Sequence, residues 1–339
     1  MFHWKENEPL HKHTTLRVGG VARFFAHVTN EQELDQAVGY AQENNLPITV
    51  LGGGSNVLVS DEGLAGLTIS LQISGITTEI DAGKVMLTAA AGEQFDDVVA
   101  HAVGKEYWGL ENLSHIPGST GAVPVQNVGA YGVEVADLIA SVRVYNITQR
   151  KYEVLTNTEC SFGYRDSIFK KEVGKHYIVT EVTFLLTTEH SPNLEYKDLQ
   201  TKFSGTDPSI QEVRDAVIEI RSKKFPDWHV VGTAGSFFKN PVIQREKFNE
   251  LKDTYPELPG FPNAEGNVKV PLGWILDKVL HLKGVGSGNV EQYQGQALVL
   301  VNKGGARASE IIDHANSVAQ KVYDTTGIEV EWEVTKVGF

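Results

Sequence analysis

The sequence is poor in cysteine, has no excess of basic residues and contains no long hydrophobic run. Cys160 is the single cysteine among 339 residues, which excludes an internal disulfide framework and a cysteine-based zinc cage. The formal net charge is −13, whereas a nucleic-acid-binding surface is basic. No apolar run approaches the roughly 18 residues of a membrane span, and residues 1–16 lack the apolar core of a signal peptide. We therefore expect a cytoplasmic protein that binds neither nucleic acid nor membranes.

The remaining composition is that of an ordinary globular protein, with 41% hydrophobic and 22% charged residues. A chain of this length is expected to form two or three domains. Amphipathic helices are expected at residues 31–45, 93–107 and 212–225. Residues 109–134 show no helical pattern, and residues 328–334 are expected to form the last strand. Helices and short strands are unevenly mixed without a repeat, which predicts the α+β class.

Three successive glycines separate two β-rich runs in the segment VLGGGSNVLVSD, residues 50–61. Glycine lets the backbone approach a ligand closely, and Ser55, Asn56 and the loop amides could form a nest for a pyrophosphate. A glycine-rich turn without a ligand is an equally good interpretation. The spacing matches neither the dinucleotide fingerprint GxGxxG nor a phosphate-binding GxxxxGK[ST] loop.

A second glycine- and proline-rich segment, IPGSTGAVPVQNVGAYGVE, covers residues 116–134. A loop of this length is usually functional. Its small residues would let backbone groups contact a flat ring system, and Gln126 and Asn127 supply donors and acceptors. A binding loop is therefore favoured over a plain surface loop.

Arg165 and Cys160 lie in the segment CSFGYRDSIFK, residues 160–170. A guanidinium between aromatic and apolar positions usually pairs with a carboxylate or a phosphate. An internal partner, such as Asp166 or a core acid, is favoured over a ligand. Cys160 is expected to be a buried small side chain, because no partner histidine is evident.

Ser236 and Glu333 are two further candidates whose local sequence leaves their roles open. Ser236, in TAGSFFKNP, could be a nucleophile, a proton donor or a turn residue, and the GxSxG elbow of one hydrolase class is absent. Glu333 alternates in phase with Glu331 in the expected last strand, where a solvated strand edge is the favoured interpretation. The histidines show no metal-ligand spacing, so no metal site is expected.

Taken in order, six segments resemble one known family, the UDP-N-acetylenolpyruvoylglucosamine reductases (MurB) of bacterial peptidoglycan synthesis. The resemblance runs along nearly the whole chain. The segments are TLRVGGVA (15–22), LGGGSNVLVSD (51–61), IPGSTGAVPVQNVGAYGVE (116–134), FGYRDSIFK (162–170), AGSFFKNP (234–241) and EVEWEV (329–334).

The resemblance implies a specific α+β architecture. It implies an FAD-binding domain of the vanillyl-alcohol-oxidase (PCMH) type in two subdomains, the first from residues 1–75 with 329–339 and the second from residues 76–225. A smaller α+β substrate-binding domain would span residues 226–328. We expect a monomer that uses non-covalent FAD and NADPH and no other partner than its small-molecule substrate.

The same resemblance implies which residues bind the cofactor. They belong to the two glycine-rich segments, which contain neither histidine nor cysteine for a covalent flavin. The implied residues are Gly52, Gly53, Gly54, Ser55, Asn56, Pro117, Gly118, Ser119, Gln126, Asn127, Gly129, Ala130 and Tyr131.

The reaction implied by the resemblance is the reduction of an enolpyruvyl ether on a UDP-sugar. A hydride passes from N5 of reduced FAD to C3 of the enolpyruvyl group, and C2 receives a proton. Ser236 matches the proton donor of the family, while Arg165 and Glu333 match the pair that flanks the substrate carboxylate. Three more residues, implied to bind the substrate, are Tyr196, Lys224 and Asn240, and Tyr196 resembles the loop tyrosine that covers the substrate in one of two subtypes.

Two alternatives stay open, namely another FAD-dependent oxidoreductase of the same fold and a nucleotide-sugar-binding protein without redox activity. We predict that the purified protein carries the visible absorption of oxidised flavin and that NADPH bleaches it. A protein that binds FAD but is not reduced by NADPH would favour the first alternative. A colourless protein that neither binds FAD nor oxidises NADPH would contradict the reductase.

Overall fold

The computed structural model describes residues 3–339, which form two compact units. Unit 1 comprises the residues up to Glu8 together with Ala22–Gly53 and Ala65–Ser222. Unit 2 comprises Pro9–Val21, Gly54–Leu64 and Lys223–Phe339. The glycine-rich segment 50–61 passes from one unit to the other between Gly53 and Gly54. The three-part domain division expected from the sequence remains a prediction.

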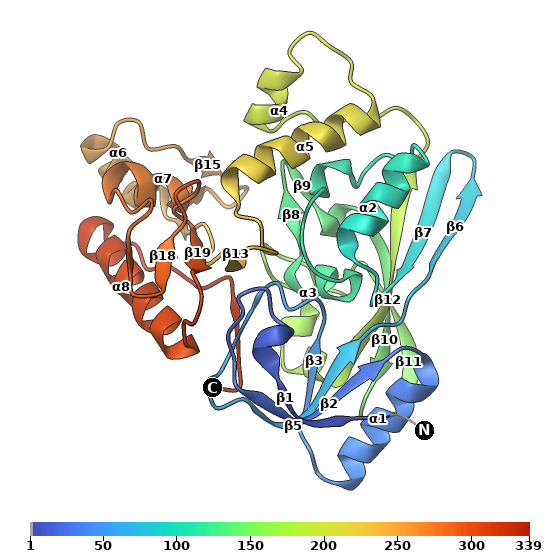
Figure 1. The fold of residues 1–339 in the computed structure, drawn as a ribbon. Coiled ribbons are helices and arrows are strands. Elements are labelled where there is room, and N and C mark those ends of the chain that lie inside the picture. The colour runs from blue at the N-terminus through green and yellow to red at the C-terminus, as the bar shows by residue number, and fades with distance from the viewer. Residues whose placement is uncertain (1–2) are drawn as a thin grey trace. The chain divides into compact units, whose positions relative to one another are not determined.

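The N-terminal part of unit 1 is a four-stranded sheet with one helix packed on it (Figure 1). Its strands, in spatial order, are β1 (Lys5–Pro9), β2 (Val21–Val28), β5 (Leu64–Leu71) and β3 (Ile48–Leu51). Helix α1 (Glu31–Glu43) begins after Asn30, whose side-chain oxygen accepts a hydrogen bond from the Glu33 amide. The expected helix at 31–45 is therefore present and ends two residues early. Its apolar face is buried against the sheet residues Val28, Leu67 and Ile69.

The second part of unit 1 is an antiparallel five-stranded sheet. Its strands, in spatial order, are β11 (Lys151–Thr156), β10 (Ile139–Asn146), β12 (Tyr177–Thr187), β7 (Lys84–Ala90) and β6 (Ile76–Asp81). Helix α2 (Phe95–Gly104) buries Phe95, Val98 and Val99 in the same core as β7 and β12. Helices α4 (Lys197–Lys202) and α5 (Ile210–Lys224) follow, and α5 matches the helix expected at 212–225.

The glycine-rich region 109–134 contains short helices, so the expectation of no helix there was wrong. Helix α3 (Val123–Gln126) carries a proline in its first turn, where a missing amide costs nothing. Val123 and Pro124 are buried and supply the packing that a short helix needs. A hairpin of β8 (Gly129–Ala130) and β9 (Val133–Glu134) follows. Further short 3-10 turns in the chain are Leu10–Lys12, Glu111–Leu113, Thr120–Ala122, Val135–Asp137, Ile168–Lys170 and Val173–His176.

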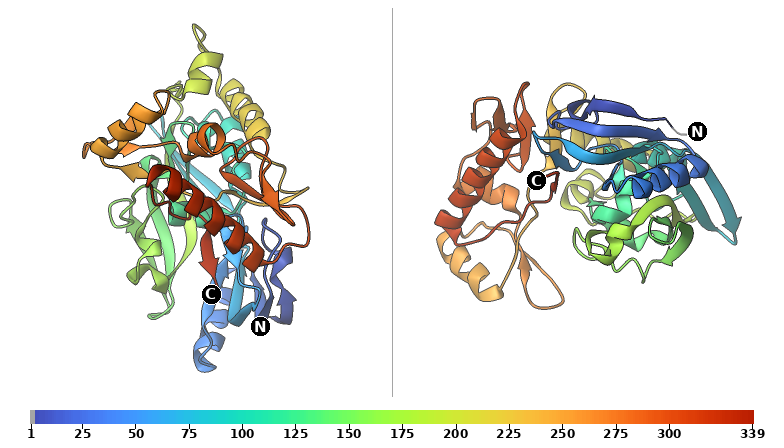
Figure 2. Two further views of the ribbon diagram at one scale, coloured as in Figure 1. Left: turned by 90° about the vertical axis from the view of Figure 1, so that its left-hand side faces the viewer. Right: turned by 90° about the horizontal axis from the view of Figure 1, so that it is seen from below.

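Unit 2 contains three small sheets and three α-helices. The largest sheet has the order β13 (Gly232–Ser236), β19 (Val299–Asn302), β18 (Val290–Gln292) and β17 (Gly286–Ser287). The second has the order β14 (Val242–Ile243), β16 (Val268–Lys269) and β15 (Phe261–Pro262), and the third is the pair of β20 (Thr335–Val337) and β4 (Val57–Val59). The helices are α6 (Arg245–Thr254), α7 (Leu272–Trp274), which continues as a π-helical turn over Ile275–Val279, and α8 (Ala308–Thr326). Figure 2 shows α8, the long red helix, from two further sides.

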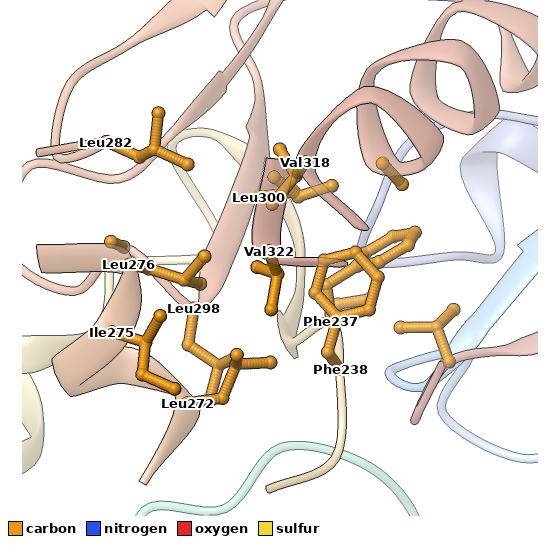
Figure 3. Close-up of a cluster of buried hydrophobic side chains, with 14 of the residues drawn as sticks. Phe237, Phe238, Leu272, Ile275, Leu276, Leu282, Leu298, Leu300, Val318 and Val322 are labelled. Atoms are coloured by element: carbon orange, nitrogen blue, oxygen red, sulfur yellow. The ribbon is translucent and has the colours of Figure 1, made fainter. Parts of the chain in front are cut away.

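A large hydrophobic cluster lies in the core of unit 2 (Figure 3). Phe237 and Phe238 follow β13 directly and are 0% and 1% exposed. Leu272 and Ile275 from the α7 region and Val322 from α8 belong to the same cluster. The two phenylalanines of TAGSFFKNP are thus core residues, and they anchor the chain immediately after Ser236.

The last strand lies further along the chain than expected. Strand β20 (Thr335–Val337) pairs in parallel with β4 (Val57–Val59), whereas residues 328–334 are an extended segment with one isolated bridge, from Trp332 to Phe238. The Trp332 ring packs edge-on against Phe237, with centroids 4.8 Å apart. This aromatic packing helps to position the segment. An alternation of polar and apolar residues does not reveal it.

Among residues 3–339, none of the helices combines the length and the apolar character that crossing a membrane requires. Within the same residues, no three histidine, cysteine or carboxylate side chains gather as a metal site.

Asp61, the last residue of the first glycine-rich segment, holds the N-terminus of α8. Its carboxylate accepts hydrogen bonds from the amides of Ala308 and Ser309, at 2.8 and 3.1 Å, and from the Ser309 hydroxyl at 2.9 Å. Burial raises the pKa of Asp61, but these hydrogen bonds outweigh it, and the pKa is lowered overall. A carboxylate at the positive end of the helix dipole is favourable as well.

We predict that Asp61→Ala lowers the free energy of unfolding by about 1–2 kcal/mol at pH 7, the usual contribution of a helix cap. A lowered pKa means that this stabilisation is complete above the ordinary pKa and is lost as the pH falls through the lowered value. The difference from wild type should therefore shrink below about pH 4 in urea titrations. Asp253→Ala, which removes an exposed carboxylate of α6, is the control and should change little. A difference that persists unchanged at low pH would contradict this role of the Asp61 charge.

Candidate active site

In unit 1, the glycines Gly52 and Gly53 pack directly against the second glycine-rich segment. A Cβ atom on Gly52 would lie 2.2 Å from the Ser119 hydroxyl oxygen, and one on Gly53 would lie 2.7 Å from the Cα of Gly118. The Gly53 amide donates to the Ser119 hydroxyl at 3.3 Å. The two backbones can approach this closely because no side chain stands between them.

Asn127 and Gln126 are fixed at the end of α3. Asn127 adopts a left-handed conformation, with φ of 44°, and is 1% exposed. Its amide nitrogen donates to the Glu134 carboxylate and the Gly163 carbonyl at 2.9 and 2.8 Å, and its oxygen accepts from the Ala136 amide. These hydrogen bonds show that the buried Asn127 side chain stabilises the conformation of the second glycine-rich segment. The Gln126 side-chain oxygen accepts a hydrogen bond from Lys170.

The Arg165 guanidinium is held by carbonyl groups of the same loop. Its nitrogens donate to the carbonyl of Gly129 at 2.8 Å and to that of Asn127 at 3.3 Å. A Cβ on Gly129 would lie 3.1 Å from the guanidinium, so glycine suits this position. Asp166, one of the internal partners expected from the sequence, forms an ion pair with Lys171. These two carbonyl oxygens hold the guanidinium against the binding loop.

Tyr131 and Tyr196 form an aromatic pair in unit 1. Their ring centroids are 5.0 Å apart in an edge-on arrangement, with Tyr131 buried and Tyr196 39% exposed. The buried Asn112 side chain donates to the carbonyls of Tyr131 and Asn193, at 2.8 and 2.9 Å. Asn112 therefore ties the loop that carries Tyr196 to the hairpin turn. Asn112 could not be recognised from the sequence, because a lone asparagine outside a motif carries no signal.

In unit 2, Ser236 and Glu333 lie on neighbouring extended segments. Ser236 ends β13, directly after Gly235, whose φ of 71° favours glycine. The Glu333 amide donates to the carbonyl of Phe237 at 2.9 Å. Both residues are half-buried. The regular strand expected at Glu331 and Glu333 is absent, whereas Glu331 is exposed, as a solvated edge requires, and pairs with Lys239.

The remaining candidates of unit 2 have diverse surroundings. Gly54 has a φ of 63°, and a Cβ there would lie 2.1 Å from the carbonyl oxygen of His13. Asn56 donates from its side chain to the carbonyl of Glu333 at 3.2 Å.

The Asn240 side-chain oxygen accepts a hydrogen bond from the Leu272 amide at 2.9 Å and so caps α7. Three further candidates are half-buried in their units, namely Ser55, Lys224 at the end of α5, and Pro117.

Cys160 is a buried core residue, as expected. It is 0% exposed, and burial raises the pKa of its thiol to about 12. A thiol that stays protonated is a poor nucleophile. The structure thus excludes Cys160 from the chemistry.

The candidate residues are divided between the two units. Those of unit 1 are Gly52, Gly53, Pro117, Gly118, Ser119, Gln126, Asn127, Gly129, Ala130, Tyr131, Arg165 and Tyr196, and those of unit 2 are Gly54, Ser55, Asn56, Lys224, Ser236, Asn240 and Glu333. Within unit 1 the structure brings Arg165 to the binding loop, and within unit 2 it brings the segment of Glu333 to that of Ser236.

Comparison with known proteins gives a consistent result along the chain. Residues 22–149 match the family model of an FAD binding domain, and residues 226–337 match that of the UDP-N-acetylenolpyruvoylglucosamine reductase C-terminal domain. The chain is 38% identical to the UDP-N-acetylenolpyruvoylglucosamine reductase of Ralstonia nicotianae over 332 residues, which cover 96% of each chain. It is 39% identical to that of a Neisseria meningitidis strain over 326 residues, which cover 95% of this chain and 94% of the relative.

A crystal structure of UDP-N-acetylenolpyruvylglucosamine reductase (MurB) from Thermus caldophilus is similar over 99% of both chains, with a TM-score of 0.68 and 25% identity. The α+β class and the FAD-binding domain of the vanillyl-alcohol-oxidase type are thereby confirmed.

We predict that Gly53→Ala lowers the affinity for FAD about tenfold, because the new Cβ would meet the Gly118 backbone and one loop must move. Flavin fluorescence during titration of the apoprotein measures the affinity. Gly104→Ala is the matched control, since a Cβ at the exposed end of α2 meets nothing within 4 Å. Equal affinities of the two variants would show that the close approach of the loops is irrelevant to FAD.

Proposed function

The chain belongs to the UDP-N-acetylenolpyruvoylglucosamine reductase family, and from that membership we propose that it reduces UDP-N-acetylglucosamine enolpyruvate to UDP-N-acetylmuramate with NADPH as electron donor. Membership makes it an FAD-dependent oxidoreductase, a UDP-N-acetylmuramate dehydrogenase of peptidoglycan precursor synthesis. A monomeric state and a cytoplasmic location remain predictions.

FAD fits the residues of the two glycine-rich segments. The close backbone approach of Gly53 to Gly118 supports a pyrophosphate at this point, and the loop at 126–131 is suited to the flat ring system. Neither segment contains a histidine or cysteine, which supports non-covalent binding. When bound and reduced, FAD supplies the hydride that adds to C3 of the enolpyruvyl group.

The observation that carries the proposal is the hydrogen bond between the Glu333 amide and the Phe237 carbonyl. It fixes Glu333 beside the segment of Ser236. Hydride addition at C3 leaves negative charge at C2 and on the adjoining carboxylate, and this charge requires electrostatic stabilisation. Arg165, oriented by two carbonyls, supplies a positive charge for that carboxylate. Glu333 is the second group proposed to act on that carboxylate.

Ser236 donates the proton to C2. A hydroxyl is a weak acid, but a carbanion is a very strong base, so the transfer is feasible once the hydroxyl is positioned. Ser236 is the last residue of β13, and the two residues that follow it, Phe237 and Phe238, are buried in the core. That anchoring supports a fixed hydroxyl.

Three residues are proposed to bind the remainder of the substrate. Tyr196, half-exposed on the loop tied down by Asn112, covers the substrate, as in the tyrosine-loop subtype. Lys224 contributes a positive charge for phosphate. Asn240, whose side-chain oxygen caps α7, is proposed to bind the substrate through its side-chain nitrogen.

We predict that Ser236→Ala leaves flavin reduction by NADPH unchanged and slows reoxidation by the enolpyruvyl substrate about 10²- to 10⁴-fold, the range for loss of one catalytic proton transfer. Stopped-flow measurement of the two half-reactions separates the effects. Ser287→Ala removes an exposed hydroxyl of the same unit and is the control. Equal slowing of both half-reactions would show that Ser236 is structural. A wild-type protein whose reduced flavin is not reoxidised by the substrate would contradict the proposed function.

A further inference from the structure

Asn56 lies in the segment expected to bind FAD, but its side chain contacts the backbone of Glu333, which a role in cofactor binding does not explain. Its side-chain nitrogen donates a hydrogen bond to the carbonyl of Glu333 at 3.2 Å. Its own carbonyl accepts a hydrogen bond from the Thr335 amide at 3.0 Å. One residue of the glycine-rich loop thus holds the chain directly at Glu333 and again two residues later.

The peptide groups of Glu333 are held from two sides. The amide donates to the Phe237 carbonyl at 2.9 Å, and the carbonyl accepts from Asn56. This matters because residues 328–334 are not part of a regular strand, and β20 begins only at Thr335. A segment without continuous ladder bonds depends on individual contacts for its register.

The donor itself is placed firmly. Asn56 follows Gly54, whose left-handed backbone lies against His13, and the Gly54 carbonyl accepts from the Thr15 amide at 3.0 Å. On its other side, β4 begins at Val57 and pairs with β20. A side chain between two anchored points is suited to orient a catalytic group.

We propose that Asn56 is a positioning residue for Glu333, so that the loop expected to bind FAD also sets the place of the carboxyl that acts on the substrate. This inference rests on the proposed function for the role of Glu333. Asn56 touches the backbone of Glu333 and acts through it. Since a side-chain amide has two N–H groups, one can hold Glu333 while the other remains available to the cofactor.

The main test is Asn56→Leu, which removes the donor, keeps a similar volume and adds no charge. Asn56→Ala is the second variant, in case leucine does not fit. The control is Asn302→Asp, because Asn302 also donates from its side chain to a backbone carbonyl of unit 2, that of Leu16, at 3.1 Å. Aspartate keeps the acceptor oxygen for the Gly304 and Ala306 amides, but it removes the donor and adds a negative charge, so the control is the more disruptive substitution.

Two readouts on the FAD-loaded enzyme decide the matter. We expect amide hydrogen exchange in peptides spanning residues 331–337 to accelerate about tenfold in both Asn56 variants, the factor that one hydrogen bond contributes. Reoxidation of the reduced flavin by the enolpyruvyl substrate should slow about 10- to 100-fold, the effect of a small displacement. Flavin reduction by NADPH should be unchanged. Asn302→Asp should leave the exchange of 331–337 and both half-reactions as in wild type.

Unchanged exchange in residues 331–337 of both variants would overturn the proposal. So would equal slowing of the two half-reactions together with a fall in FAD affinity, which would make Asn56 a cofactor contact alone. The hydrogen-exchange result does not depend on the substrate. A wild-type enzyme that fails to use the substrate would therefore contradict the proposed function and leave the placement of Glu333 by Asn56 to be judged by exchange.

Discussion

The hydrogen bond from the Glu333 amide to the Phe237 carbonyl is the constraint on which the arrangement of unit 2 depends. Phe237 is buried in the core, and its amide donates to the Leu298 carbonyl of the neighbouring chain segment. The position of Ser236 follows from this anchoring, because it precedes Phe237 directly. Glu333 is then placed by main-chain hydrogen bonds. Because Phe237 is fixed in the packed core, the two residues attached to it, Ser236 and Glu333, are held in fixed positions as well.

Unit 1 follows the same principle with different groups. Arg165 is oriented by the carbonyls of Asn127 and Gly129, and the buried Asn127 fixes their loop with bonds of its own. Backbone acceptors thus set the direction of a charged side chain. The glycines Gly53 and Gly118 contribute a different feature, because they let two loops approach closely without side chains between them. Orientation of the charge and close approach of the loops are therefore provided by separate residues.

The sequence predicted the features that depend on local periodicity. Helices α1, α2 and α5 were expected from apolar spacing, and Asn30 shows the capping that starts α1. Helix α3 was missed, because a four-residue helix is too short to show a period, and it forms through burial of Val123 and Pro124. The last strand was placed too early, because an alternating pattern does not reveal that Trp332 packs on Phe237.

The sequence by itself determined the α+β class, the inertness of Cys160 and, through six ordered segments, the family and the identity of the candidate residues. These follow from composition, short-range spacing and the order of motifs, all of which are properties of the linear chain. Only the tertiary structure decided that carbonyls of the binding loop hold Arg165 and that Asn56 holds Glu333. The reason is physical: the partners in the second bond are 277 residues apart, and a side-chain bond to a backbone carbonyl requires no particular residue at the acceptor, so no sequence pattern records it.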